Sequence, residues 1–238
     1  MGHFPTTHQR VVDTLGQRIV DGEWEPGAPL PVEDALATEI GVSRGALREA
    51  VKSLVAKGML HVRPRTGTRV QPPEHWNHLD PDVLRWKQSG DAAALLRDTS
   101  ELRRIVEPAA TRLAAERADP DRVRALYDAL TAMETAAASP GRAGYVEADI
   151  AFHRALLDAG GNHLLGSLGR AVEIALEHSF VISTQTPGAV ESSLPGHRAI
   201  VEAIEAHDPA AAATAVQTLI DAAEQEIARS PGMPGDTA

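Results

Sequence analysis

The sequence contains no cysteine, and aromatic residues make up only 3% of its 238 residues. The absence of cysteine excludes a disulfide framework and any thiolate metal site. The scarcity of aromatic side chains argues against binding of single-stranded nucleic acid by base stacking. No apolar run is long enough to cross a bilayer, and the N-terminal residues lack the apolar core of a signal peptide. We therefore expect a cytoplasmic protein without a membrane partner.

The chain as a whole also lacks a basic excess, because its formal net charge is -10. Between Gly41 and Gln71, however, seven Lys and Arg residues stand against one acid, Glu49, which gives this segment a net charge of +6. Attraction to phosphate depends on the local field, since charges are screened over about 8–10 Å at physiological salt. The sequence therefore allows one DNA-binding segment in an otherwise acidic chain.

The N-terminal third has the pattern of a winged helix-turn-helix. Gly41 and Val42 form a tight turn between two segments of helical spacing, and Ser43 is a typical N-cap for the second of them. Two short β-type runs then flank a turn at 64–67, as in a hairpin wing. The predicted elements are helices over 8–21, 32–40 and 43–57, followed by strands over 60–63 and 68–71.

The second of the paired helices has two distinct faces. Its apolar residues at helical spacing are predicted to face the core: Leu47, Val51, Leu54 and Val55. Arg44, Arg48 and Lys52 recur every four residues and form one basic stripe, which we call the recognition stripe. Arginines placed one turn apart suit the major groove, where Arg can contact guanine in bidentate fashion. The alternative is a solvated helix face that is basic without binding DNA.

The rest of the chain predicts an all-α bundle. Residues 1–73 would form the DNA-binding domain, 74–91 a connector with a short helix, 92–230 the helical domain and 231–238 a disordered tail. Ala and Leu recur with helical period in the third of these segments, and Pro and Gly punctuate it. The predicted bundle helices cover 92–117, 120–138, 142–159, 162–184, 190–207 and 209–229.

Three residues of the bundle predict a metal site. Asp149 and His153, four residues apart, fall on the apolar face of their helix, and His197 aligns with apolar residues of a later helix. A carboxylate facing inward costs several kcal/mol unless it is paired or ligates a metal. One Asp and two His therefore suggest a divalent-cation site with an open position. The alternatives are an Asp149–arginine pair and core histidines satisfied by hydrogen bonds.

Arg103 borders a predicted inner stripe formed by Leu102, Val106, Ala109 and Leu113. An arginine at the edge of a bundle interior suits a carboxylate ligand, because the guanidinium fork matches a carboxylate. The spacing equally allows an ion pair between Arg103 and Glu107. The spacing alone supports the two interpretations of Arg103 equally.

These motifs together resemble the GntR superfamily of bacterial regulators. The N-terminal resemblance rests on G22-x-W24-x-P26-G27, L30-P31, V42-S43-R44, L47-R48-E49-A50 and G67-T68-x-V70. The C-terminal part is similar to the FCD effector domain through E101-L-R103-x-x-x-E107-P108, D149-x-x-F152-H153, N162 and H197-R-A-I200. Within that branch, the chain is most similar to galactonate-responsive regulators, through W76-N-x-L79-D80-x-D82-V83-L84-x-W86 and R103-x-x-V106-E107-P108.

The resemblance implies roles for individual residues. The implied DNA-binding residues are Ser43, Arg44, Arg48, Lys52, Arg65, Thr66, Gly67 and Thr68. Many relatives carry an arginine where this chain has Asp34, which implies a different operator preference. Asp149, His153 and His197 match metal ligands, and Arg103 matches the arginine that binds the effector's acid group. A fourth ligand, a histidine in many FCD domains, is replaced here by Leu219, which leaves three protein ligands and leaves the identity of the metal open. The resemblance favours zinc, with nickel or manganese as alternatives.

The sequence thus predicts a homodimeric transcription regulator rather than an enzyme. As a repressor, it would bind double-stranded operator DNA and release it when a small carboxylic acid, a sugar acid such as galactonate, enters the bundle. One alternative is a metal-sensing regulator in which the ion itself is the signal. The other is a metal-dependent enzyme, which is disfavoured because no general base is placed beside the three ligands.

Overall fold

The computed structural model describes residues 7–63, 67–90, 92–184 and 186–229. The chain divides into two compact units, 1–92 and 93–238, and each is described by itself. The predicted wing tip at 64–66 and the predicted tail at 231–238 lie outside the described residues. No helix of the described residues is long and apolar enough to span a membrane.

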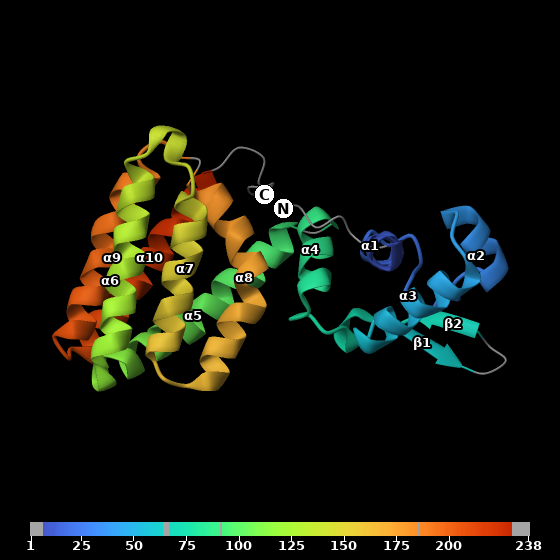
Figure 1. Ribbon diagram of the computed structural model, residues 1–238, viewed down its shortest axis with the longest axis horizontal. Coiled ribbons are helices and arrows are strands. Elements are labelled where there is room, and N and C mark those ends of the chain that lie inside the picture. The colour runs from blue at the N-terminus through green and yellow to red at the C-terminus, as the bar shows by residue number, and fades with distance from the viewer. Residues whose placement is uncertain (1–6, 64–66, 91, 185, 230–238) are drawn as a thin grey trace, which may run out of the picture. The chain divides into compact units, whose positions relative to one another are not determined.

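The first unit is a winged helix-turn-helix (Figure 1). Its elements are α1 (Thr7–Val20), α2 (Glu33–Ile40), α3 (Arg44–Ala56), β1 (Leu60–Arg63), β2 (Gly67–Val70), a 3-10 turn (Pro73–His75) and α4 (Pro81–Gly90). The two strands pair antiparallel, with Leu60 opposite Val70 and Arg63 opposite Gly67. Helices and wing therefore follow the order and, within one or two residues, the boundaries that the sequence predicts.

Local chemistry explains the turn between α2 and α3. Gly41 ends α2 in the left-handed region at φ 74°, which costs a residue with a Cβ more than glycine. Ser43 caps α3, because its hydroxyl accepts a hydrogen bond from the amide of Ala46 at 3.2 Å. The buried face of α3 differs in part from the prediction: Leu47, Ala50 and Leu54 are buried, whereas Val55 is exposed.

The segment predicted as a connector packs within the first unit. Val83 and Trp86 of α4 belong to the same core cluster as Val11 and Leu15 of α1. The Trp86 ring lies directly over Gly16, where a Cβ would come within 2.3 Å of the ring. The indole N–H of Trp86 also donates to Asp13 at 3.2 Å. The short helix is thus held to α1 by both packing and a hydrogen bond.

The second unit is an antiparallel helical bundle (Figure 1). It contains α5 (Ala92–Arg117), α6 (Pro120–Ala137), a 3-10 turn (Pro140–Arg142), α7 (Tyr145–Ala159), α8 (His163–Ser183), α9 (Ala189–Glu205) and α10 (Pro209–Arg229). Neighbouring helices pack in the pairs α6–α7, α7–α8, α6–α9, α9–α10 and α8–α10. The core consists mainly of aliphatic side chains and includes the fully buried Phe152. The all-α prediction is confirmed.

Candidate functional site

Asp149 and His153 are buried polar residues on the inner face of α7. Their spacing of four residues places them about one turn apart on that face, beside the fully buried Phe152. Three charged residues of the same helix are exposed: Glu147, Arg154 and Asp158. The α7 sequence therefore sets a carboxylate and an imidazole among apolar side chains.

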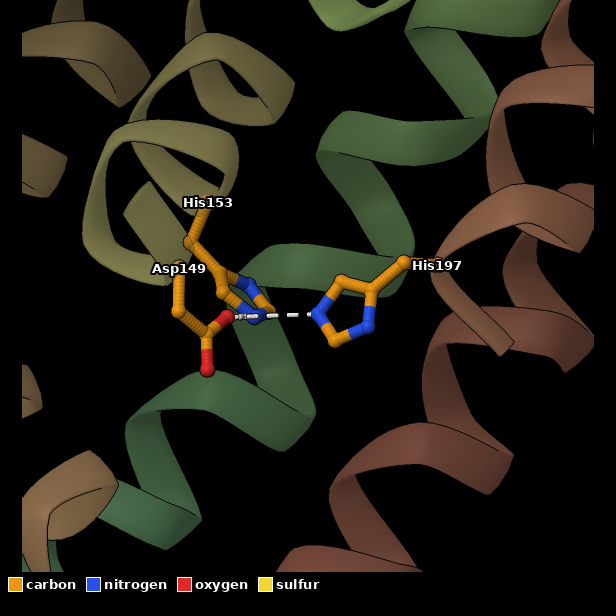
Figure 2. Close-up of side chains that lie close together, drawn as sticks. All are labelled: Asp149, His153 and His197. Atoms are coloured by element: carbon orange, nitrogen blue, oxygen red, sulfur yellow. Dashed lines mark ion pairs between the residues drawn. The ribbon is translucent and has the colours of Figure 1, made fainter. Parts of the chain in front are cut away.

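His197 of α9 completes the cluster, as Figure 2 shows. Its Nε2 lies 3.2 Å from Oδ1 of Asp149, and Nε2 of His153 lies 3.4 Å from the same oxygen. All three side chains are at most 8% exposed. The alternative of an Asp149–arginine pair is not what the structure shows, because the ion pairs of Asp149 join it to the two histidines.

The hydrogen bonds of the two Nδ1 atoms determine which nitrogen of each imidazole carries the proton. Nδ1 of His197 lies 2.9 Å from the carbonyl oxygen of Ser193, and Nδ1 of His153 lies 3.0 Å from Oε2 of Glu107. A carbonyl or carboxylate oxygen only accepts, so both Nδ1 atoms carry the proton. In neutral imidazoles, both Nε2 lone pairs then point toward Oδ1 of Asp149. Oδ1 of Asp149 and Nε2 of His197 accordingly have no hydrogen bond of ordinary geometry.

Facing lone pairs in a buried space repel one another unless positive charge offsets them, and Nη2 of Arg103, 3.5 Å from Nε2 of His153, supplies part of that charge. Burial would raise the pKa of Asp149, but hydrogen bonds and positive charge from its histidine neighbours, which require a proton on the facing nitrogens, hold this pKa below its usual range. Burial would lower the pKa of His153, but Glu107 and Asp149 together raise it, so a proton can take the place of a cation. Ligands about 2.0–2.1 Å from a tetrahedral zinc ion lie roughly 3.3 Å apart. The two separations from Oδ1 of Asp149, 3.2 and 3.4 Å, are of this size, and all three candidate ligand atoms lie within 4.8 Å of one another.

Glu107 of α5 is the site residue that the sequence interpretation missed. It accepts a hydrogen bond from Nε of Arg103 at 2.7 Å and one from Nδ1 of His153 at 3.0 Å. Burial would raise its pKa, but the charges of Arg103 and His153 lower it to about 2. A carboxylate behind an imidazole fixes the tautomer and raises the basicity of a metal ligand. The i,i+4 spacing was the available signal, but it indicated only an ion pair with Arg103 and not support for His153.

Arg103 is buried rather than at the border of the bundle interior. The predicted inner stripe through Ala109 was wrong, since Ala109 is exposed and the buried face of α5 runs through Arg103, Glu107 and Ala110. The buried face of α5 can include Arg103 and Glu107 because the two opposite charges pair with each other. Arg103 also packs over the Phe180 ring, with Cζ 4.9 Å from its centroid. The ion pair with Glu107 is confirmed, and Arg103 also lines a cavity, where its binding of a carboxylate ligand stays a prediction.

The three candidate ligands open onto a cavity of about 270 Å³. Arg103 lines the cavity on the side of α5. Small side chains of α9 and α10 make up much of its wall, namely Ala189, Gly196, Ala199, Ala215, Ala222 and Ala223. Leu219 of α10 also lines it, and no further ligand joins Asp149, His153 and His197 among the described residues. A small molecule in this cavity would lie beside the cluster.

The recognition stripe lies on the exposed face of α3. The side chains of Arg44, Arg48 and Lys52 are 67%, 64% and 73% exposed, opposite the buried face of the same helix. Gly67 and Thr68 begin β2 of the wing, whereas the predicted contacts Arg65 and Thr66 lie outside the described residues.

Each cation of the recognition stripe is paired with an acid. Arg44 Nη2 lies 2.8 Å from Oδ2 of Asp34, and Lys52 Nζ lies 2.7 Å from Oε1 of Glu49. Arg48 makes two contacts with Glu33, at 2.6 Å from Nε to Oε1 and 2.8 Å from Nη2 to Oε2. Glu33 and Asp34 belong to α2, outside the segment whose charge was counted. The local field at the stripe is therefore weaker than +6 implies.

Comparison with known proteins agrees with this architecture. Residues 7–70 match the family described as bacterial regulatory proteins, gntR family, and residues 98–222 match the FCD domain. The galactonate operon transcriptional repressor of Escherichia coli K12 is 36% identical over 220 residues, which are 92% of this chain and 95% of that protein.

Two solved structures share the fold. A GntR protein of Streptococcus agalactiae is 29% identical and has a TM-score of 0.54, with 92% of this chain and 99% of that chain covered. A regulator of Listeria monocytogenes, Lar, is 21% identical and has a TM-score of 0.64, with 94% and 98% covered. The domain matches, the identity and the coverage together show that this chain belongs to the GntR family of bacterial transcription regulators and carries an FCD domain.

Proposed function

We propose that this regulator is a repressor whose FCD domain binds a small sugar acid at a divalent metal ion and thereby releases operator DNA. The observation that carries the proposal is the convergence of Asp149, His153 and His197 on one point at the edge of a cavity. These three residues would hold the ion. When bound, such an ion supplies a Lewis-acidic position that accepts a carboxylate oxygen.

Arg103 is suited to the acid group of the ligand. Its Nε is committed to Glu107, but the guanidinium has further N–H groups, and the side chain lines the cavity. A guanidinium beside a cation site favours an anion and fixes its orientation through paired hydrogen bonds. The acid group would therefore bind between Arg103 and the ligand cluster.

The remainder of the cavity suits a ligand with several hydroxyl groups. Thr184, Ser192 and Thr218 line it, and each hydroxyl donates to a backbone carbonyl of its own helix, at 2.7, 2.9 and 2.9 Å. Since these hydroxyl protons are engaged, the oxygens remain as acceptors for donors on a ligand. A sugar acid brings such donors, whereas a fatty acid does not. The galactonate operon repressor, the relative described above, supports the same class of ligand.

Operator binding would require two copies of the chain. One winged module buries too little surface for tight specific binding, so a homodimer on a palindromic operator is proposed. The ligand can release DNA only if it binds more tightly to the arrangement that does not hold the operator. The proposal is thus a shift between two dimer states rather than direct competition at the recognition stripe.

An operator-release assay tests the proposal. A duplex selected in vitro with the wild-type protein would be titrated with a panel of aldonates, with and without a metal chelator. We expect release by at least one sugar acid, loss of that response in chelator and in His153→Ala, and retention in His163→Ala, whose histidine is exposed on α8. Release by chelator alone, with no response to any acid, would instead identify a metal sensor. Conversion of the acid during incubation would identify an enzyme.

A further inference from the structure

Glu33 holds Arg48 in a geometry that differs from the other pairs of the recognition stripe. Glu33 is the first residue of α2, and Arg48 lies in the second turn of α3, so their pair crosses the helix-turn-helix. Both oxygens of the carboxylate are used, with Nε to Oε1 at 2.6 Å and Nη2 to Oε2 at 2.8 Å. The hydrogen bond from Arg48 lowers the pKa of Glu33, so the carboxylate is ionised at neutral pH.

This contact occupies one edge of the guanidinium and leaves another free. Nε and the adjacent proton of Nη2 face Glu33, whereas Nη1 and the second proton of Nη2 form the outer edge. Two N–H groups on one edge are what a bidentate contact with O6 and N7 of guanine requires. Glu33 therefore restrains the plane of the Arg48 side chain without blocking the edge that could contact a base.

The other two pairs do not orient a planar group in this way. Arg44 approaches Asp34 with its terminal Nη2, which lies 2.8 Å from Oδ2. Lys52 pairs with Glu49 on the same helix, and an ammonium group has no plane to fix. Asp34 and Glu49 thus act mainly as negative charges near the stripe, and DNA phosphates would compete with them.

We propose that Glu33 is a positioning residue for base recognition, which preorganises the guanidinium of Arg48 for a bidentate contact in the major groove. The inference rests on α3 being the DNA-reading helix. The two possible roles of Glu33 predict opposite changes in DNA affinity when it is removed, because Glu33 is a negative charge close to negatively charged DNA. Removing that charge should strengthen all DNA binding if charge alone matters, but should weaken recognition of the preferred sequence if Glu33 orients Arg48.

The experiment compares Glu33→Ala with Asp34→Asn, a neighbouring variant that removes one negative charge from the same helix. Binding to a duplex selected in vitro with the wild-type protein, and to a scrambled duplex of equal length, is measured by fluorescence anisotropy at several salt concentrations. Glu33→Ala should bind the selected duplex about tenfold more weakly and the scrambled duplex no more weakly than wild type. Asp34→Asn should bind both duplexes more tightly. Glu33→Gln, which retains one acceptor for Arg48, should be intermediate.

A double variant separates positioning from other effects. In an Arg48→Ala background, Glu33→Ala should no longer lower the preference for the selected duplex. Tighter binding of both duplexes by Glu33→Ala, as for Asp34→Asn, would overturn the proposal, as would an undiminished effect without Arg48. Unchanged binding of the selected duplex by Arg48→Ala alone would instead remove Arg48 from recognition. The Glu33 side chain is 37% exposed, so these variants leave the core of the first unit intact.

Discussion

At the scale of single residues, the centre of the second unit is a chain of buried polar contacts. Arg103 donates to Glu107, Glu107 accepts from His153, and His153 faces Asp149 together with His197. Removing any one of these residues would leave a charge or a lone pair of its neighbour without a partner. The candidate site therefore depends on a residue that does not itself face the cation position.

Glu107→Gln tests that dependence. The substitution keeps the shape of the side chain but leaves the guanidinium of Arg103 without its counter-charge, which should lower the free energy of unfolding by about 3 kcal/mol. Loss of the carboxylate behind His153 should also weaken metal binding by about 10–100-fold. Urea unfolding followed by circular dichroism and zinc titration against a competing chelator measure the two effects. The control is Glu101→Gln at an exposed position of α5, and equal behaviour of the two variants would contradict the prediction.

The sequence predicted these residues unevenly, for physical reasons. Asp149 and His153 stand out because helical periodicity places them among apolar residues of one face. Glu107 does not, because an Arg and a Glu four residues apart look alike on a solvated face and in a core. Only the three-dimensional neighbours decide that Arg103 and Glu107 are buried. The same limit applies to Glu33 and Asp34, which lie across a turn from the cations they pair with.

At the scale of elements, the boundaries were predictable because the signals are local. Gly41 ends α2 and Ser43 caps α3, and the proline at Pro209 begins α10. The packing of α4 on α1 was not predictable, because a short helix between two domains carries no pattern that identifies its partner. Its attachment to α1 is visible in Trp86 over Gly16, and an ion-pair cluster joins its start to Lys57, the residue after α3.

Gly58→Ala should destabilise the first unit more than Gly41→Ala. Both glycines have positive φ, 77° and 74°, so alanine at either position costs about 1–2 kcal/mol of backbone strain. A Cβ at Gly58 would also come within 2.1 Å of the carbonyl oxygen of His75, whereas nothing lies within 4 Å at Gly41. Urea unfolding followed by tryptophan fluorescence compares the variants, and equal losses of stability would show that the chain at His75 moves freely aside.

The ion-pair cluster beside α4 gives a pH dependence. Lys57 Nζ lies 2.7 Å from Oδ1 of Asp80 and 2.8 Å from Oδ2 of Asp82. Burial would raise the pKa of Asp82, but Lys57 and Arg85 lower it below its ordinary value. A carboxyl with a lowered folded pKa stabilises the protein above its unfolded pKa of about 3.9, and this contribution is lost as pH falls through the folded value.

We therefore expect the free energy of unfolding of the first unit to fall at pH values below about 4. The Lys57→Met variant should show a smaller fall over the same range, because it already lacks the ion pair whose loss destabilises the wild type. Unfolding midpoints from tryptophan fluorescence between pH 3 and pH 8 measure the slopes. Lys87→Met is the control: it removes one positive charge from α4, and its unfolding midpoint should depend on pH as in the wild type. A Lys57→Met curve as steep as wild type at acid pH would show that the cluster does not hold Asp82 ionised.

At the scale of the whole molecule, the two units carry different spectroscopic signals. All three tryptophans, Trp24, Trp76 and Trp86, lie in the unit of residues 1–92, whereas the candidate metal ligands lie in the unit of residues 93–238. Tryptophan fluorescence therefore reports the first unit, and circular dichroism reports mainly the long helices of the second.

Zinc should raise the midpoint of the dichroism transition more than that of the fluorescence transition. An ion present at 100 times its dissociation constant stabilises the unit that binds it by about 2.7 kcal/mol. His197→Ala should abolish the shift, whereas His207→Ala, at an exposed position after α9, should preserve it. Equal shifts of both transitions would mean that the two units unfold together, and no shift of either would remove the proposed metal site.

The wall of alanines and glycine around the cavity has a consequence for how this protein could diverge. The space beside Asp149, His153 and His197 exists because α9 and α10 carry short side chains there, while the groups that would anchor an acid come from α5, from α7 and from His197 of α9. One added branch at Ala199, Ala215 or Ala222 would change the size of molecule admitted and leave the anchoring groups in place. Under the proposed function, such substitutions would change which acid acts as the inducer, while the groups that bind its carboxylate would stay the same.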